Sequence, residues 1–431
     1  MKKNLFFWIM ALMICAAVGC ADNTIYEPEK PMLKKMSHEV TQAEARKNLE
    51  KFIANIKTPA TRGGEQRSLP PITSVYTTGK PAEATRSGEA EPYFHIFNFG
   101  DNEGFAIMSG DDRVEPLLAL TFKGELTPET EIDNPGFKIA YSKMEDYYAA
   151  KTMGGPSVNP DIPIPPRDSV QYPDFELPVR YEEDTVKVYI DMPYGHCQVK
   201  WGQGEQYNRY CLLPNTSQRA PTGCVATAMA QLMSIYKYPN SYEECIFNWN
   251  HMLHSDQYVD GKDQINLLMQ QLGLSDNLAM RYSLGDEGST ANYNNIPRTF
   301  INFGYANGGT KLAYSSSRAT QELKNGYPFL ICGNDGISSS GHMWLAHGLM
   351  ELRLNTKGYN EFDNVVLSNS ILLNYYILYN WGWDGVCDGY FLDRIFDPYA
   401  TEYRFPESTT RIDTPQNYQH DITIFVNIRK N

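Results

Sequence analysis

Residues 222–233 read TGCVATAMAQLM, and this stretch decides how the rest of the chain is interpreted. Apolar residues repeat at helical spacing from Val225 onward, so we expect a buried helix that begins at Cys224 and ends before Pro239. The positive end of a helix stabilises a thiolate, and its free N–H groups can donate to the oxyanion that forms when the thiolate attacks a carbonyl. Cys224 is therefore a candidate nucleophile, against the alternative of a small buried apolar residue.

A nucleophilic cysteine needs a base, and two histidines lie in the strand-rich part of the sequence. His342 follows a Ser-Gly turn and enters the apolar segment 343–346, where its side chain can face a cleft. His347 is five positions further on, so in a regular strand it points to the opposite face. We therefore expect His342, rather than His347, to face Cys224.

Two further segments supply groups that such a pair uses. Asn380 and Trp381 follow His342 by 38 and 39 residues, and there an amide can orient the imidazole while an indole shields it from water. Gln203 precedes Cys224 by 21 residues and can supply a side-chain amide to an oxyanion hole. The alternative for the Asn-Trp segment is a Gly-Trp turn that fills a core. The order of these groups resembles that of papain-like thiol proteases.

The resemblance becomes specific in several short segments, which are similar to the streptopain-like cysteine peptidases over about residues 195–430. The segments are WGQ at 201–203, TGCVATAMAQLM at 222–233, FGY at 303–305, LKNGYP at 323–328, GH at 341–342 and NWGW at 380–383. The stretch GFAIMSGDDR at 104–113 is similar to the inhibitory propeptide of that family. The resemblance implies an α+β fold, with a papain-like domain of helix on antiparallel sheet after a small α+β prodomain.

The resemblance also implies what the chain does. It implies a secreted zymogen, a hydrolase that cleaves protein or peptide substrates through a Cys-His acyl-enzyme, with its own prodomain as inhibitor and no metal or organic cofactor. Cys224 would be the nucleophile, His342 the general base and Gln203 an oxyanion donor. Trp381 would pack on or orient the His342 ring, with Asn380 as the rival for the orienting role.

The sequence departs from the family pattern in two places. His347 stands where the family commonly has Asp, so a second imidazole could titrate near His342. Residues 354–373 contain extra turn and apolar residues, which indicate an inserted hairpin. Such a hairpin could reshape the cleft or carry a site for a partner.

The length of 431 residues suggests two or three domains, and seven prolines between residues 156 and 178 mark the main boundary. A run this rich in proline cannot be helical and predicts a stiff linker that holds the activation site. We expect a signal peptide at 1–20, a tether at 21–36, an inhibitory prodomain at 37–153, a Pro-rich linker and activation region at 154–190 and a peptidase domain at 191–431.

The N-terminus predicts export. Lys2 and Lys3 precede an apolar run from residue 5 to 18, which is too short for a transmembrane helix and ends in small residues before Cys20. This pattern resembles a bacterial lipoprotein signal, so we expect a lipid anchor on Cys20 and a place in the cell envelope or at the cell surface, with release after processing as the other outcome. The alternative is an ordinary secretory signal.

Charge and cysteine content narrow the partners. The net charge is −13, which disfavours nucleic-acid binding because phosphates are recognised by Lys and Arg. Six cysteines remain beyond Cys20, none in a CxxC pair, and an oxidising compartment would allow up to three disulfides. Two rival functions stay open, a cell-wall peptide hydrolase on the same fold and a catalytically inert surface binding protein.

Overall fold

The computed structural model describes residues 38–54, 56, 69–79, 93–152, 180–285, 288–334, 341–397 and 422–431. The expectations for the signal peptide, the tether and most of the Pro-rich linker lie outside the described residues. Residues His38–Asn431 form one compact unit. Among the helices in the described ranges, none combines the length and apolar character that a bilayer crossing requires.

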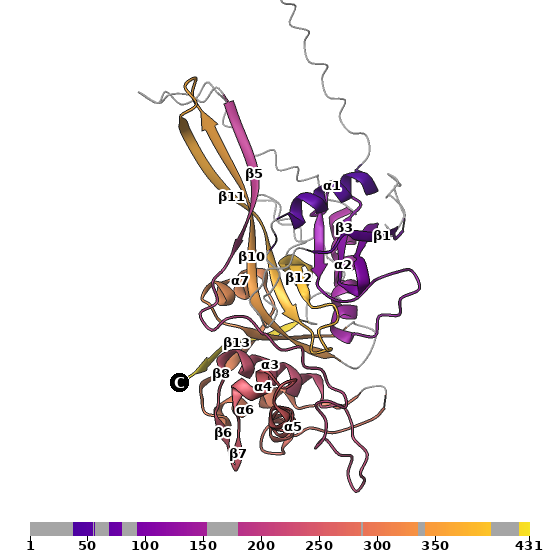
Figure 1. The fold of residues 1–431 in the computed structure, drawn as a ribbon, viewed down its shortest axis with the longest axis vertical. Coiled ribbons are helices and arrows are strands. Elements are labelled where there is room, and N and C mark those ends of the chain that lie inside the picture. Colours follow the sequence, from indigo (N-terminus) through magenta and orange to yellow (C-terminus); the bar gives the residue numbers. More distant parts are fainter. Residues whose placement is uncertain are drawn as a thin grey trace, which may run out of the picture. The chain divides into compact units, whose positions relative to one another are not determined.

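Within these ranges one antiparallel sheet of eleven strands runs through the molecule (Figure 1). Its order is β1-β2-β3-β4-β12-β11-β10-β9-β13-β8, and β5 pairs with β10 beyond the end of β9. The strands are β1 (Ile72–Thr77), β2 (Phe94–Phe99), β3 (Phe105–Ser109), β4 (Leu117–Thr121), β5 (Arg180–Tyr189), β8 (Tyr305–Ala313), β9 (Phe329–Gly333), β10 (His342–Tyr359), β11 (Val365–Asn380), β12 (Gly389–Leu392) and β13 (Thr423–Lys430), with a small separate hairpin of β6 (Ser241–Tyr242) and β7 (Cys245–Ile246).

Two hydrophobic cores lie on opposite faces of this sheet at the first residues of β10. Side chains alternate along a strand, so Trp344 belongs to the core that includes α1 and α2, while Met343 and Leu345 belong to the core of α3 and α5. The helical segments are α1 (Gln42–Ile53), α2 (Pro135–Thr152), α3 (Cys224–Tyr236), α4 (Trp249–Leu253), α5 (Val259–Gly273), α6 (Ile296–Asn302) and α7 (Ser316–Lys324), with short 3-10 turns η1 (Gly100–Asn102), η2 (Tyr293–Asn295) and η3 (Asp393–Phe396). The α+β expectation is confirmed.

The N-terminal module (residues 38–152) and the C-terminal module (residues 180–431) share this sheet. Strand β4 pairs antiparallel with β12, so that Leu120 lies opposite Tyr390. Apolar side chains of both modules also belong to one core. The Pro-rich segment separates the modules along the chain, yet edge pairing joins them in space.

Strand β5 corrects the expected linker boundary. Residues 154–190 were expected to form a linker, but the last part of that range is β5, which pairs with β10 from Arg180 opposite Tyr359 to Tyr189 opposite Met350. The strand is mostly exposed, and its first half carries consecutive acidic residues instead of the alternation that predicts a strand. Its partner strand, distant in the chain, decides its structure.

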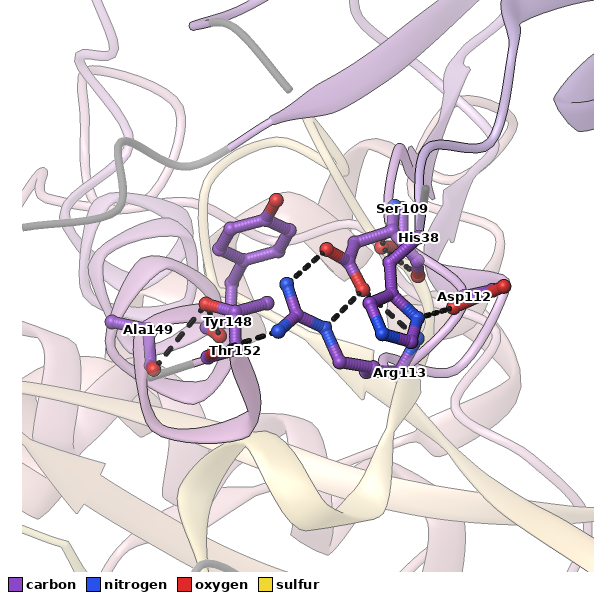
Figure 2. Close-up of polar contacts among 8 residues, drawn as sticks. His38, Ser109, Asp112, Arg113, Tyr148, Ala149 and Thr152 are labelled. Atoms are coloured by element: carbon purple, nitrogen blue, oxygen red, sulfur yellow. Dashed lines mark hydrogen bonds and ion pairs between the residues drawn. The ribbon is translucent and has the colours of Figure 1, made fainter. Parts of the chain in front are cut away.

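The loop after β3 ties the two ends of the N-terminal module together (Figure 2). Arg113 binds both carboxylate oxygens of buried Asp111 at 2.9 and 2.6 Å, and it donates to the carbonyl of Thr152 at the end of α2 at 2.9 Å. His38 contacts Asp112 at 2.6 Å. His38, Asp111 and Asp112 lie close enough to share a cation, but Arg113 already occupies both oxygens of Asp111. The cluster therefore links the start of the module, the loop after β3 and the end of α2.

Candidate active site

Cys224 lies where α3 meets the surface. Residues 225–236 of this helix are buried, whereas Cys224 is partly exposed. Gly223 precedes it at the N-cap with a φ of +87°, and a Cβ there would lie 2.3 Å from the terminal methyl of Met280. The positive φ favours glycine at this position, and the turn brings the thiol to the helix N-terminus.

The thiol lies beside the start of β10. Backbone groups of Met343, of Val225 and of Cys224 itself lie near the sulfur and favour the thiolate. Burial is the larger effect and raises the pKa of the thiol above its usual value. Met343 directly follows His342, so the start of α3 and the start of β10 are neighbours.

His342 is the first residue of β10, and its imidazole is enclosed. Its Nε2 lies 2.8 Å from the backbone carbonyl of Trp381, and its ring stacks on Trp344 with a centroid distance of 6.3 Å. Trp383 approaches edge-on at 6.3 Å. Burial lowers the pKa of His342 to about 4, against the opposing effect of the bond to Trp381. The imidazole is therefore neutral at physiological pH. Because Nε2 faces a carbonyl, it carries the proton and leaves the lone pair on Nδ1.

Asn380 does not bond to the imidazole of His342 but to the peptide group that does. Its Oδ1 accepts from Gln231 Nε2 at 2.8 Å and from the Gly382 N–H at 3.0 Å, and its Nδ2 donates to the Val199 carbonyl at 2.8 Å. The Gly382 N–H belongs to the same peptide group as the Trp381 carbonyl that accepts from His342. Asn380 thus fixes the acceptor of the imidazole, and it does so through the main chain.

Trp381 orients His342 with its carbonyl, while its indole fills the core. The side chain is completely buried, and its Nε1 donates to the Cys387 carbonyl at 2.7 Å. Its backbone N–H donates to Asp388 at 2.9 Å. Burial raises the pKa of Asp388 to about 7. Both the backbone N–H and the indole N–H of Trp381 are therefore bonded within the loop that follows β11.

Gln203 approaches the nucleophile through its backbone. Its carbonyl accepts from the Thr222 N–H at 3.0 Å, two residues before Cys224, and its side chain is partly exposed. The carbonyl of Trp201 accepts from Gln231 Nε2 at 2.8 Å, which ties this segment to α3. The structure therefore ties the main chain of Gln203 to the segment just before Cys224.

His347 belongs to a different set of contacts. It is buried, and its Nδ1 accepts from the backbone N–H of Cys197 at 3.1 Å. Burial and the neighbouring His196 lower its pKa well below the usual value. The sequence suggested that His347 could titrate near His342. In the structure His347 is instead a neutral imidazole that accepts from Cys197, in the segment that leads to Gln203.

The N-terminal module presses on the imidazole. Gly136, in the first turn of α2, lies so close that a Cβ there would be 2.5 Å from the Trp381 ring and 2.8 Å from Cδ2 of His342. Asn134 donates to the Val386 carbonyl at 2.8 Å, and this bond holds the start of α2 against the loop after β11. Access to His342 from this side is closed.

Sequence reasoning missed four residues that shape the site. Gln231 was part of the quoted motif but had no assigned role, and Trp344 and Trp383 were visible only as apolar residues near the predicted histidine and asparagine. Gly136 carries no local signal, because its role depends on the docking of one module on another. The six cysteines were candidates for disulfides, and the structure shows free thiols at Cys197, Cys211, Cys224, Cys245, Cys332 and Cys387.

We expect Cys224 of the intact chain to react slowly with iodoacetamide at about pH 7. Burial raises its pKa, and below the pKa the reactive thiolate falls tenfold for each unit of pH. The rate should therefore still be climbing at pH values above the usual pKa of a free thiol. Mass spectrometry of the Cys224 peptide measures it. Alkylation at pH 7 as fast as that of the chain freed from its N-terminal module would contradict this expectation.

Comparisons with protein families and with known proteins follow the same division of the chain. Residues 201–391 match the Peptidase C10 family, and residues 37–148 match the family described as Spi protease inhibitor. The chain is 27% identical over 238 residues to the thiol protease/hemagglutinin PrtT of Porphyromonas gingivalis, which covers 55% of this chain and 23% of that protein.

Two further similarities span both modules. Streptopain of Streptococcus pyogenes serotype M1 is 23% identical over 351 residues, which cover 71% of this chain and 75% of streptopain. The structure of a Prevotella intermedia prointerpain A fragment matches with a TM-score of 0.50 and 20% identity, over 83% of this chain and 100% of that fragment. The chain thus spans less than a quarter of PrtT but three quarters of streptopain.

Proposed function

We propose, from the premise that this chain belongs to the Peptidase C10 family, that it is the precursor of a cysteine endopeptidase which its own N-terminal module keeps inactive. One observation carries the proposal. The Cys224 sulfur lies near the backbone of Met343, the neighbour of His342, while Gly136 of the inhibitor-family segment covers that imidazole.

The residues divide the chemistry as follows. Nδ1 of His342 takes the thiol proton, and the Cys224 sulfur attacks the scissile carbonyl carbon. The backbone N–H of Cys224 and the side-chain amide of Gln203 stabilise the oxyanion. The imidazolium then protonates the leaving amine as the C–N bond breaks, and His342 next removes a proton from the water that hydrolyses the thioester.

The precursor is held in the wrong protonation state for this reaction. The pKa of the thiol is raised and that of His342 is lowered to about 4, so both groups are neutral near pH 7. Removal of the N-terminal module would hydrate the imidazole and raise its pKa, because burial is the main cause of its low value. A thiolate-imidazolium pair can then form.

The test uses the processed protein with two substrates and one inhibitor. Denatured casein and peptidoglycan are offered separately, with or without an epoxide that traps reactive thiolates. We expect casein to be cleaved, and cleavage to stop when one equivalent of epoxide is attached to Cys224. Cleavage of peptidoglycan alone would favour a cell-wall hydrolase. An unlabelled Cys224 with neither substrate cleaved would favour an inert binding protein.

Replacing Gln203 with alanine should slow hydrolysis without abolishing it. Loss of one oxyanion donor typically costs on the order of 10²–10³-fold in rate, while the backbone donor at Cys224 remains. The loss should lie in kcat rather than in KM, because the oxyanion exists only on the reaction path. Steady-state kinetics on a fluorogenic peptide give both values. A variant with unchanged kcat would remove Gln203 from the mechanism.

Export and lipid anchoring belong to the proposal as well, on the strength of the N-terminal sequence. Lys2 and Lys3, the apolar run at 5–18 and Cys20 predict a signal peptide and a lipid-modified cysteine. Peptides are then cleaved at the cell envelope or cell surface. Replacing Cys20 with serine should prevent lipid labelling and move the protein from the membrane fraction to the soluble fraction. Unchanged fractionation would contradict the anchor.

A further inference from the structure

The outer half of the β10–β11 hairpin is left unused by the proposed function. Strand β12 pairs with β11 only from Tyr376 to Tyr379, and β9 pairs with β10 only as far as Ala346. Beyond these strands the described chain continues as a ribbon of β5, β10 and β11 (Figure 1). The ribbon has two open edges, which are β5 and the part of β11 from Val365 to Tyr375.

The two edges differ in charge. Strand β5 carries Glu182, Glu183 and Asp184 in a row, and charges of this kind protect an edge strand from pairing with another chain. The open part of β11 reads VVLSNSILLNY and contains no charged residue, proline or glycine. Val365 and Leu367 are 52% and 42% exposed. Among the described strands, this edge therefore has the character of a template for a further strand. At Ser370 its backbone groups are covered by side chains, because the N–H donates to Asn369 Oδ1 at 2.8 Å and the carbonyl accepts from Arg353 at 3.2 Å, so pairing there requires these two side chains to turn away.

The open edge is symmetric about Asn369. On either side of Asn369 the residues have the same character: Ser368 and Ser370 are both serines, and Leu367 and Ile371 are both aliphatic. The next two positions on each side are also apolar. Pairing with β10 is regular from Leu367 to Leu372, and alternation along the strand puts Leu367, Asn369 and Ile371 on one face.

We propose that this edge pairs antiparallel with the same edge of a second copy of the chain, about a twofold axis at Asn369. Leu367 of one copy then lies opposite Ile371 of the other, Ser368 lies opposite Ser370, and the two Asn369 side chains face each other. An isologous contact requires such a self-complementary pattern, whereas an unrelated extended peptide does not.

The charge of the whole chain fits the same arrangement. A net charge of −13 opposes association of two copies, so a contact strand without charge is where they can approach. In the paired ribbon the order is β5-β10-β11 of one copy followed by β11-β10-β5 of the other. The two acidic β5 edges then form the outer borders, where their charges prevent further growth.

Sedimentation velocity on the full chain tests the proposal, with Cys224→Ser in all samples to keep one chain length. We expect a concentration-dependent dimer. Asn369→Lys places two like charges opposite each other at the axis and should raise the dissociation constant at least tenfold. Thr185→Lys adds the same charge on the exposed β5 edge and should leave the dimer unchanged. A chain that stays monomeric at every concentration, or a dimer that both variants weaken equally, overturns the proposal.

A crosslink gives a second readout that does not depend on loss of binding. Asn369→Cys should form a disulfide-linked dimer under mild air oxidation, since the axis brings the two introduced thiols together as O₂ takes up their electrons and protons. Thr185→Cys should remain uncrosslinked under the same conditions. Thermal melting curves check that each variant is folded. Equal crosslinking at positions 369 and 185, or none at 369 in a folded variant, overturns the predicted axis.

Discussion

Replacing Cys224 with serine should abolish peptide-bond hydrolysis and leave the precursor at its full length. A hydroxyl group remains protonated where a thiol ionises, so its nucleophilicity beside a neutral imidazole is far lower. Loss of a covalent nucleophile typically costs on the order of 10⁴-fold or more in kcat. Casein hydrolysis measures the activity, and the mass of the purified chain reports whether maturation is autocatalytic.

A second thiol in the same region gives the control. Cys332 lies on β9 opposite Met343, it is partly exposed, and its electrostatic environment includes Cys224. Cys332→Ser therefore makes the same chemical change beside the nucleophile. We expect it to keep activity within a few-fold of the unmodified enzyme. Wild-type rates for Cys224→Ser, or equal losses in both variants, would show that Cys224 is not the nucleophile.

The positions of Cys224 and His342 at the start of a helix and of a strand could be predicted because their signals are local. A glycine before the helix, a thiol at its first turn and apolar residues behind it together determine where Cys224 lies. Likewise His342 follows a turn and begins an apolar strand, so its place at the mouth of β10 could be expected. Each of these features depends on a few neighbouring residues.

The contacts of the orienting residues could not be read from the sequence. Asn380 was expected to compete with Trp381 for the imidazole ring, but its amide contacts Gln231 and Gly382, and the acceptor for His342 is a backbone carbonyl. A main-chain acceptor has no residue type that could reveal it. Only the path of the loop after β11 determines which carbonyl faces the ring.

The pairing of the N-terminal and C-terminal modules into one sheet could not be predicted from the sequence either. Strand β4 pairs with β12, and β5 pairs with β10, across separations of well over a hundred residues. Nothing in the local pattern of either partner specifies the other. The proline-rich segment predicts a boundary along the chain, and the pairing shows that the inhibitor-family segment is built into the same sheet as the proposed active site.

Replacing Gly136 with alanine should release the inhibition that this sheet maintains. The residue lies inside the first turn of α2, where alanine is normally the better helix former by about 1 kcal/mol. Here, however, the added Cβ would lie 2.5 Å from the Trp381 ring and 2.8 Å from the His342 imidazole. Overpacking of this kind costs about 1–3 kcal/mol. We therefore expect α2 to withdraw from His342 about ten to a hundred times more often.

The rate of Cys224 alkylation in the intact chain measures this opening, with Lys138→Ala as the matched variant. Lys138 lies two residues further along α2 and is exposed, so its truncation changes the same helix without touching the site. We expect faster alkylation and faster self-processing for Gly136→Ala and unchanged rates for Lys138→Ala. If Gly136→Ala were instead slower to react and more stable, helix propensity would outweigh the contact. The inhibitory role of the first turn of α2 would then have to be abandoned.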